Sequence, residues 1–208
     1  MCIRDRYSAV ELFSAWAKAG RDEGMEKGHY ASVMSMIDIV RARLPQSFSA
    51  IDIGCGNGWL VRELQKAPDC NKSTGVDGSY EMIAKARKTN PEGDYVLAGL
   101  PNWAPADSYD LAISMEFMYY LEDPSSFLKT IHDDWLGPKG CLAFGIDHYA
   151  ENPSSLSWPS SLGLELATLS EKDWVSSMWD AGFTNVESSR VEVRENWSGT
   201  LVVVGSKN

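Results

Sequence analysis

The sequence has few basic residues for its length, and this shortage limits the partners that it can bind. Its 208 residues include 19 lysines and arginines against 29 aspartates and glutamates, which gives a formal net charge of −10 at pH 7. Duplex binding needs clustered Lys and Arg side chains that displace counterions from the phosphates. The acidic balance therefore makes nucleic acid a poor partner, and none is predicted.

Long apolar runs and paired cysteines are also absent. No run of 18 or more apolar residues occurs, and charges interrupt the first twenty residues, where a signal peptide would need an apolar stretch. Cys2, Cys55, Cys70 and Cys141 show neither CxxC spacing nor a neighbouring histidine pattern, so no metal site is predicted. We expect a cytoplasmic protein with reduced thiols and no membrane partner.

The length predicts one domain, because a chain of this size can bury most of its apolar surface in a single core. Residues 1–6, MCIRDR, look like a translated sequencing adapter and are left out of the fold prediction. Residues 7–44 carry two helical patterns, and the polar, glycine-punctuated stretch 20–29 between them is not expected to form a regular helix. An α/β core is predicted for residues 45–208.

After Pro45, short apolar runs alternate with helical patterns, which is the rhythm of a mostly parallel sheet with helices on both faces. Two β-rich runs near the end, 186–193 and 200–204, predict an antiparallel hairpin. The other expected elements are strands at 49–53, 73–76, 95–97, 111–114 and 141–146, and helices at 60–65, 81–89, 125–135 and 171–179.

A glycine-rich stretch after the first expected strand is the most informative motif. It reads AIDIGCGNGW and places Gly54, Gly56 and Gly58 directly before a helix. Alternate glycines let the backbone approach a ligand closely, and the helix N-terminus presents free N–H groups. Asp77 follows Gly58 by nineteen residues, at the end of the next strand, where a carboxylate can accept hydrogen bonds from both ribose hydroxyls. A nucleoside-containing cofactor is predicted.

The same spacing also suits a nicotinamide dinucleotide, so an NAD(P)-dependent oxidoreductase is the alternative. The dinucleotide fingerprint is GxGxxG, whereas this chain has GxGxG with Trp59 at the last position of the longer motif. A pyrophosphate packs less easily against a helix that starts with such a bulky side chain. A Tyr-x-x-x-Lys dyad is also missing, which favours another nucleoside cofactor.

These motifs resemble those of class I S-adenosylmethionine-dependent methyltransferases, in particular the branch with small-molecule and quinone methyltransferases. The resemblance covers about residues 45–204. It implies a Rossmann-like seven-stranded, mostly parallel sheet with helices on both faces and an antiparallel C-terminal hairpin, and S-adenosyl-L-methionine as cofactor. It further implies that the glycine loop holds the methionine part, Asp77 the ribose and Met82 the adenine. The residues expected to bind the cofactor are Asp52, Gly54, Cys55, Gly56, Asn57, Gly58, Asp77, Gly78, Ser79, Met82, Gly99, Leu100, Ser114, Met115 and Glu116.

One position departs from the family pattern. Many relatives carry an acidic residue just before the Leu100-Pro101 pair to bind the adenine amino group, but Ala98 and Gly99 stand there in this chain. Adenine recognition is therefore expected to use the backbone or Asn102.

The resemblance implies in-line methyl transfer to a small organic acceptor whose identity and attacking atom stay open. A general base is needed only for some acceptors, and His29 and His148 are the candidate catalytic residues; the alternative for each is an ordinary polar loop residue. Tyr119 with Tyr120, and Tyr149 with Trp158, are candidate aromatic walls for the acceptor, with core packing as the alternative.

The N-terminal residues 7–44 are predicted to form a helical lid, because Trp16, Met25 and His29 precede a family core whose N-terminal helices often close over both ligands. An interhelical loop is the alternative for residues 16–29. A third hypothesis for the whole chain is a non-catalytic module that binds S-adenosylmethionine. The sequence does not indicate the oligomeric state.

Overall fold

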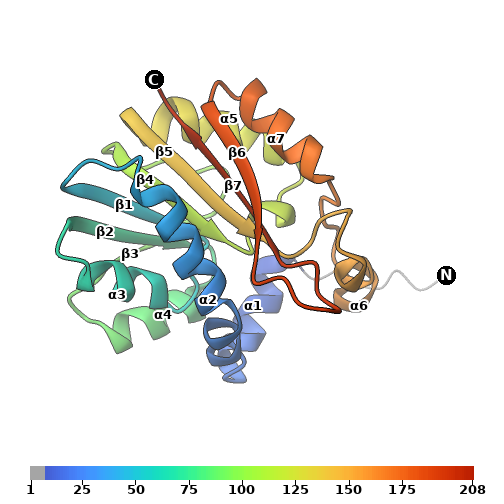
Figure 1. Ribbon diagram of the computed structural model, residues 1–208. Coiled ribbons are helices and arrows are strands. Elements are labelled where there is room, and N and C mark those ends of the chain that lie inside the picture. The colour runs from blue at the N-terminus through green and yellow to red at the C-terminus, as the bar shows by residue number, and fades with distance from the viewer. Residues whose placement is uncertain (1–7) are drawn as a thin grey trace.

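Residues 8–208 are described by the computed structural model, and seven strands within them form one sheet (Figure 1). The strands are β1 (Phe48–Ile53), β2 (Cys70–Asp77), β3 (Asp94–Leu97), β4 (Tyr109–Met115), β5 (Leu136–Ile146), β6 (Thr184–Val191) and β7 (Thr200–Ser206). Their order in the sheet is β3-β2-β1-β4-β5-β7-β6. The strands from β3 to β5 pair in parallel, whereas β7 is antiparallel to both β5 and β6. The predicted sheet and its C-terminal hairpin are thereby confirmed.

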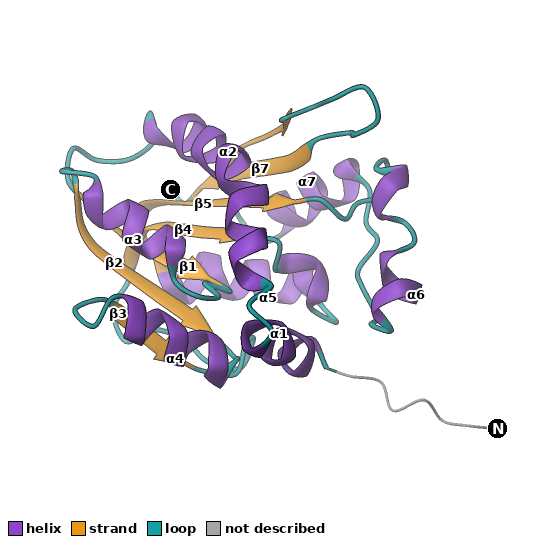
Figure 2. Ribbon diagram, turned by 90° about the horizontal axis from the view of Figure 1, so that it is seen from below, coloured by secondary structure: helices purple, strands orange, loops and turns teal. Residues whose placement is uncertain are grey.

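Helices cover both faces of this sheet (Figures 1 and 2). The α-helices are α1 (Ala9–Lys18), α2 (Asp22–Arg41), α3 (Trp59–Lys66), α4 (Tyr80–Thr89), α5 (Pro124–Thr130), α6 (Trp158–Leu162) and α7 (Glu171–Asp180). Three shorter turns are η1 (Met118–Tyr120), η2 (Ile131–Trp135) and η3 (Pro153–Ser155). The segment 151–163, for which no element was predicted, contains η3 and α6. None of the helices in the described residues is long and apolar enough to cross a membrane.

The apolar core lies in two main halves, one on each side of the sheet. Val33 and Met36 of α2 and Leu60 of α3 pack on one face with the inward side chains of β4 and β5. On the other face, Trp174 of α7 packs its ring 5.4 Å from that of Phe144 in β5. All five side chains are 2% exposed or less, so the central strands are covered on both sides as a parallel sheet requires.

The order of the strands reverses between β1 and β4, which lie side by side in the centre of the sheet. From β1 the chain crosses to β2 and β3 on one side, and it then returns to β4 on the other side. In open α/β sheets, ligands bind at the carboxyl ends of the strands next to such a reversal. A ligand site is therefore expected at the loops that follow β1, β2 and β4.

The expectation that residues 20–29 avoid regular helix was wrong, because α2 begins at Asp22 and includes Gly24 and Gly28, two of the three glycines of this stretch. Each glycine costs about 1 kcal/mol in a helix relative to alanine. Asp22 offsets part of this cost, since an acidic side chain favours the first turn of a helix and this one hydrogen-bonds to Asn57 and Lys85. The buried face that starts at Val33 anchors the rest of the helix.

The sequence predicted the other elements to within a few residues, and the prediction for residues 1–6 lies outside the described part of the chain. The largest difference in a strand is β5, which begins at Leu136 instead of Cys141. Its pairing with β4 shifts register between Tyr109 and Leu111. Lys139 adopts a φ of 64° in this irregular part.

Candidate active site

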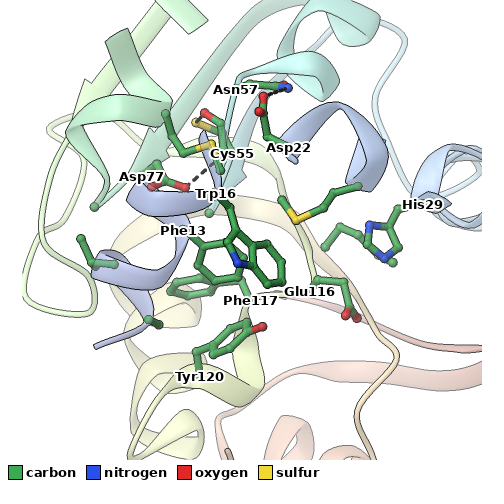
Figure 3. A pocket seen from close by; sticks show the side chains of 18 of the residues that line it. Phe13, Trp16, Asp22, His29, Cys55, Asn57, Asp77, Glu116, Phe117 and Tyr120 are labelled. Atoms are coloured by element: carbon green, nitrogen blue, oxygen red, sulfur yellow. Dashed lines mark hydrogen bonds between the residues drawn. The ribbon is translucent and has the colours of Figure 1, made fainter. Parts of the chain in front are cut away.

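A cavity of about 400 Å³ lies at the carboxyl ends of the central strands, where the strand order predicts a ligand site (Figure 3). Its floor comes from the loops after β1, β2 and β4, and its walls come from α1, α2 and the short α6. Residues far apart in the sequence, from Ala9 to Leu162, thus meet around one space. The volume lies within the usual range for small-molecule and cofactor sites.

The glycine loop between β1 and α3 needs glycine at two positions for steric reasons. Gly54 has a φ of +75°, and a Cβ atom there would lie 2.8 Å from the ring of Phe117. Gly58 has a φ of +74°, and a Cβ atom there would lie 2.4 Å from the ring of Tyr95. Larger residues would therefore clash and adopt a conformation that side chains disfavour. At Gly56 an added Cβ would meet only the sulfur of Met82, at 3.8 Å, which leaves room for a ligand to pass.

Asp77 connects the end of β2 to the glycine loop. Its Oδ2 accepts a hydrogen bond from the backbone N–H of Gly56 at 2.9 Å, and its Oδ1 accepts one from the N–H of Ser79 at 2.7 Å. Each carboxylate oxygen has a second lone pair that can accept another donor. The loop therefore holds this carboxylate in place, with capacity left for two hydroxyl groups of a ligand.

Asp52, the last polar residue of β1, lies beneath the same loop and lines the cavity. Burial raises its pKa to about 8, and the neighbouring charge of Asp77 acts in the same direction. Burial also raises the pKa of Asp77, against the two backbone hydrogen bonds that lower it. The floor of the cavity is therefore a pair of carboxyl groups that cannot easily carry two negative charges together. A cationic ligand would relieve their repulsion.

Most of the residues expected to bind the cofactor are brought together on this cavity. Asp52, Gly54, Cys55, Gly56, Asn57, Asp77, Gly78, Met82, Leu100, Met115 and Glu116 line it. Four others do not line it. Gly58 begins α3, Ser79 begins α4 by accepting a hydrogen bond from the N–H of Met82, Ser114 donates to the carbonyl of Ile53, and Gly99 lies beside Leu100.

Polar contacts fasten α1 and α2 over the cofactor end of the cavity. Asp22 of α2 is buried, and it accepts hydrogen bonds from the side chain of Asn57 in the glycine loop and from Lys85 of α4, both at 2.8 Å. In α1, the hydroxyl of Ser14 lies 2.8 Å from that of Ser79, and Lys18 forms an ion pair with Glu81 of α4 at 2.9 Å. The N-terminal helices therefore have defined attachments to the loops below them.

A second polar cluster consists of His29 and Glu116, which line the cavity, and the buried Asp147, which contacts both. Glu116 follows β4 with a φ of 57°, a backbone conformation that costs a non-glycine residue about 1–3 kcal/mol and is often found at functional sites. Its carboxylate accepts hydrogen bonds from the hydroxyl of Tyr119, at 2.6 Å, and from the backbone N–H of Asp147. The side chain of Glu116 is thus held in one orientation despite the strain.

The charges in this cluster are coupled. The pKa of Glu116 is raised to about 8, first by burial and then by the charge of Asp147, while His29 acts to lower it. Burial alone would lower the pKa of His29, but Asp147, whose Oδ2 lies 3.6 Å from Nε2, and the charge of Glu116 together raise it. The three residues each offer one ligand atom within 4.8 Å of the others. The cluster can therefore hold a proton or a cation.

The two histidines proposed as catalytic residues have different surroundings. His29 of α2 lines the cavity, whereas His148 after β5 is fully buried behind it. The ring nitrogens of His148 lie 3.0 Å from the carbonyl oxygen of Ser155 and 2.8 Å from the hydroxyl of Thr168. Burial lowers the pKa of His148, which favours its neutral form. This arrangement suits a structural residue behind the wall and places only His29 at the site.

Aromatic side chains form much of the wall. Tyr119, Tyr120 and Trp158 line the cavity as the sequence suggested, and the ring of Trp158 stacks on that of His148 with centroids 6.1 Å apart. Tyr149 does not line it, because this residue is buried beneath the hairpin and its hydroxyl donates to the carbonyls of Ser198 and Gly199. The proposed pairing of Tyr149 with Trp158 as one wall was therefore wrong.

Sequence reasoning missed several residues that line the cavity. Asp22 was overlooked because the segment around it was expected to be irregular, although an acidic residue before a long helical pattern is a typical helix start. Phe13 was recognised only as part of an amphipathic helix, and Phe117 only as part of the segment after β4. The cavity is also lined by Ala9, Val10, Trp59, Leu60, Ser161 and Leu162.

Comparison with known proteins identifies relatives of this chain. A family model described as a methyltransferase domain matches residues 13–188. Trans-aconitate 2-methyltransferase of Azoarcus sp. (strain BH72) is 31% identical over 116 residues, which are 56% of this chain and 46% of that protein. Nodulation protein S of Sinorhizobium fredii is 28% identical over 102 residues, 47% of this chain and 46% of that protein. The matches cover less than half of the length of these curated relatives.

Solved structures share the fold over most of the chain. The methyltransferase in a complex with the Haloferax volcanii Trm112 methyltransferase activator has a TM-score of 0.80 and 27% identity, covering 93% of this chain and 96% of that one. The N-methyltransferase NodS of Bradyrhizobium japonicum, in complex with S-adenosyl-L-homocysteine, has a TM-score of 0.65 and 17% identity, covering 88% and 87%. The second likeness shows the fold alone.

Proposed function

This chain belongs to the methyltransferase-domain family, and with it to the S-adenosylmethionine-dependent methyltransferases, and we propose that it methylates a small organic molecule inside the cavity. The observation that carries this proposal is the continuity of the cavity from Asp77 and the glycine loop to His29 and Glu116. One continuous space therefore has a nucleoside-binding end and a second end for an acceptor. The names of the curated relatives, trans-aconitate 2-methyltransferase and nodulation protein S, are consistent with an acceptor of this size.

The residues at the loop end fit the cofactor. The open side of Gly56 lets a chain pass close to the backbone, and Asp77 has lone pairs for the two ribose hydroxyls. Met82 lies beside this path and would pack on the adenine. S-adenosylmethionine supplies a methyl group on a positively charged sulfur, which a nucleophile can take in one displacement. Asp52 and Asp77 provide the negative environment for that charge.

The contribution of the protein to the reaction is mainly positioning and exclusion of water. Methyl transfer needs the attacking atom about 3 Å from the methyl carbon and in line with the bond that breaks, so orientation can supply much of the rate enhancement. Phe13 and Trp16 of α1 and Trp158 of α6 cover the cavity with apolar surface. Residues 7–44 act in this proposal as the lid, and residues 45–208 as the core that holds both ligands.

Two other functions predict different binding behaviour. A nicotinamide-dependent oxidoreductase would bind NADH, and a non-catalytic module would bind S-adenosylmethionine without transferring its methyl group. The test is calorimetric titration with S-adenosylmethionine, S-adenosylhomocysteine and NADH, followed by an assay of S-adenosylhomocysteine release with a broad panel of metabolites. We expect both sulfur nucleosides to bind, NADH not to bind, and at least one metabolite to be methylated. Binding of NADH alone would overturn the assignment.

The attachment of the lid leads to a further prediction. Asp22→Ala removes the hydrogen bonds from α2 to Asn57 and Lys85, and we expect the Kd for S-adenosylmethionine to rise about tenfold, because a buried hydrogen bond to a charged group contributes about 1.5–3 kcal/mol. Glu23→Ala is the matched control, since Glu23 is exposed and contacts the same lysine at 3.4 Å. Equal affinities of the two folded variants would argue against a lid fastened by Asp22.

A further inference from the structure

The cavity wall is mainly acidic. Four carboxylates line it, namely Asp22, Asp52, Asp77 and Glu116, and within the described part of the chain no lysine or arginine lines it. Carboxylates and phosphates are usually bound by Arg or Lys side chains. An anionic acceptor would therefore have only the ring of His29 to pair with, and Asp147 and Glu116 already lie beside that ring.

Only one of these carboxylates is available to an acceptor. Asp52 and Asp77 lie at the glycine loop, in the part of the cavity that fits the cofactor. Asp22 is already paired with Lys85 at 2.8 Å. Glu116 is left, and in Figure 3 it lies beside His29, on the side of Trp16 away from Asp77. From this position Glu116 would contact the acceptor, whereas the family resemblance implies that it binds the cofactor.

The carboxylate of Glu116 is prepared to accept a hydrogen bond from a ligand. Its two oxygens each receive one hydrogen bond from the protein, from Tyr119 and from the backbone of Asp147, and each retains a lone pair. The left-handed backbone conformation of Glu116 is maintained by these contacts against its cost. A carboxylate aimed into a cavity at such a cost indicates a specific ligand group.

Aromatic rings surround the space in front of Glu116. Phe13 lies edge-on to Trp16, with centroids 5.4 Å apart, and edge-on to Tyr120, at 5.2 Å. Tyr120 also contacts Tyr119, the residue that donates to Glu116. Aromatic faces attract organic cations, and a carboxylate beside them completes a site for an ammonium group. The same rings provide apolar surface for the rest of the molecule.

From this arrangement we propose that the methyl acceptor is an amine with an apolar or aromatic body, whose nitrogen is bound and oriented by Glu116. The inference rests on the methyltransferase function proposed above and specifies its substrate class. His29 extends the polar surface on which the amine docks, and the buried Asp147 lies beside its ring. Phe13, Trp16 and Tyr120 hold its body.

The reaction balances with these groups. An ammonium nitrogen has no free electron pair, so its proton must first pass to the Glu116 carboxylate or, through it, to His29. The freed nitrogen lone pair then forms the new N–C bond while the S–C bond breaks, and the electrons of that bond stay on sulfur. The sulfonium becomes a neutral thioether, the nitrogen carries the positive charge, and the base returns one proton to solvent.

A divalent metal ion in the same cluster would support an anionic acceptor instead. Both oxygens of Glu116 already accept hydrogen bonds from the protein, and Asp147 Oδ1 accepts one from the hydroxyl of Thr200 at 2.6 Å. The remaining lone pair of each Glu116 oxygen is open to a metal ion as well as to an N–H donor. Binding of an ammonium compound in the presence of EDTA therefore distinguishes the two.

Three ligands that share a phenylethyl group test the preference for charge. The protein, saturated with S-adenosylhomocysteine, is titrated with 2-phenylethylammonium, 3-phenylpropionate and 2-phenylethanol in the presence of EDTA. We expect the ammonium compound to bind at least tenfold more tightly than the carboxylate. A ratio below three, including no measurable binding of either ion, would overturn the proposal. So would tight carboxylate binding that appears only when Mg²⁺ or Mn²⁺ replaces EDTA.

Glu116→Gln tests the role of the carboxylate. We expect the preference for the ammonium compound to fall at least tenfold while the Kd for S-adenosylmethionine changes less than threefold. Glu122→Gln, at an exposed position, is the control and should behave as the parent protein. A loss of cofactor affinity in Glu116→Gln as large as the loss of ammonium binding would assign Glu116 to the cofactor and contradict the proposal.

A turnover experiment distinguishes the proposed amine acceptor from the methyltransferase activity on which that proposal rests. The protein is incubated with S-adenosylmethionine carrying a deuterated methyl group and a mixture of amines, carboxylates, alcohols and thiols, and the products are identified by mass spectrometry. Labelled N-methyl products support the inference, and labelled esters, ethers or thioethers without N-methyl products overturn it. Cofactor binding without any transfer would instead count against methyltransferase activity, while the titrations would still decide the preference for charge.

Discussion

Replacing Asp77 with asparagine is expected to weaken the binding of S-adenosylmethionine about 100-fold. The carboxylate is held by the backbone N–H groups of Gly56 and Ser79, so its free lone pairs are fixed toward the place where the ribose hydroxyls would lie. Hydrogen bonds to charged groups contribute about 1.5–3 kcal/mol each, and a loss of about 3 kcal/mol corresponds to roughly two orders of magnitude in Kd. Calorimetric titration measures the change directly.

The controls for Asp77→Asn separate ribose recognition from damage to the loop. Asparagine keeps the shape of the side chain but turns an amide N–H₂ toward one of the two backbone donors, so the thermal stability of the ligand-free variant must be measured beside its affinity. Asp107→Asn removes a carboxylate from an exposed surface pair with Lys72 and should leave the Kd unchanged. If folded Asp77→Asn binds S-adenosylmethionine within threefold of the parent protein, Asp77 does not bind the ribose.

The glycine loop and Asp77 could be predicted from the sequence because their geometry is determined locally. The positive φ angles at Gly54 and Gly58 follow from a tight turn between a strand and a helix, and alternate glycines in the sequence are direct evidence for such a turn. The position of Asp77 follows from the length of one strand–helix–strand unit. Neither inference needs knowledge of contacts between distant segments.

The lid and the polar cluster depend on such distant contacts, which limits what the sequence alone can show. Asp22 contacts Asn57, 35 residues away, and Lys85, 63 residues away, and these partners explain why a glycine-containing segment is helical. His29 and Asp147 approach each other from opposite ends of the sequence. No local pattern identifies pairs of this kind.

The two candidate histidines illustrate the same limit. Both His29 and His148 stand near the carboxyl ends of the strands, and the sequence offers no reason to prefer one. In the structure, the chain after β5 turns the ring of His148 toward Ser155 and Thr168, in the interior. The orientation of a side chain in an irregular segment depends on the neighbours that the fold brings to it, so only the structure separates these residues.

The stability of the ligand-free protein should fall as the pH rises toward 8, because of the carboxyl groups on the floor of the cavity. Burial, with a further contribution from Asp77, raises the pKa of Asp52 to about 8, whereas an unfolded aspartate has a pKa of about 3.9. Between these values the folded state binds more protons than the unfolded state, so unfolding becomes easier as the pH rises. The contribution of Asp52 to stability is therefore complete below about pH 4 and is lost as the pH passes through about 8.

Asp52→Asn isolates this contribution, since asparagine is nearly isosteric and does not ionise. The variant should match the parent protein at pH 5 and exceed its free energy of unfolding by about 2–5 kcal/mol at pH 9, given that each unit of pKa shift corresponds to about 1.4 kcal/mol. Urea denaturation of both proteins between pH 5 and 9 measures the difference. Asp38→Asn, at an exposed position of α2, is the control, and parallel curves for Asp52→Asn and the parent protein would contradict the argument.

The same ionisation should be linked to cofactor binding. S-adenosylmethionine carries a positively charged sulfonium and an ammonium group, and these charges favour the ionised form of Asp52 over the protonated one. Binding should therefore release a proton, and the affinity of the parent protein should rise between pH 6 and 9 while that of Asp52→Asn stays flat. Titrations in buffers of different ionisation enthalpy measure the released proton, and the absence of any release would show that the cofactor does not approach this carboxyl group.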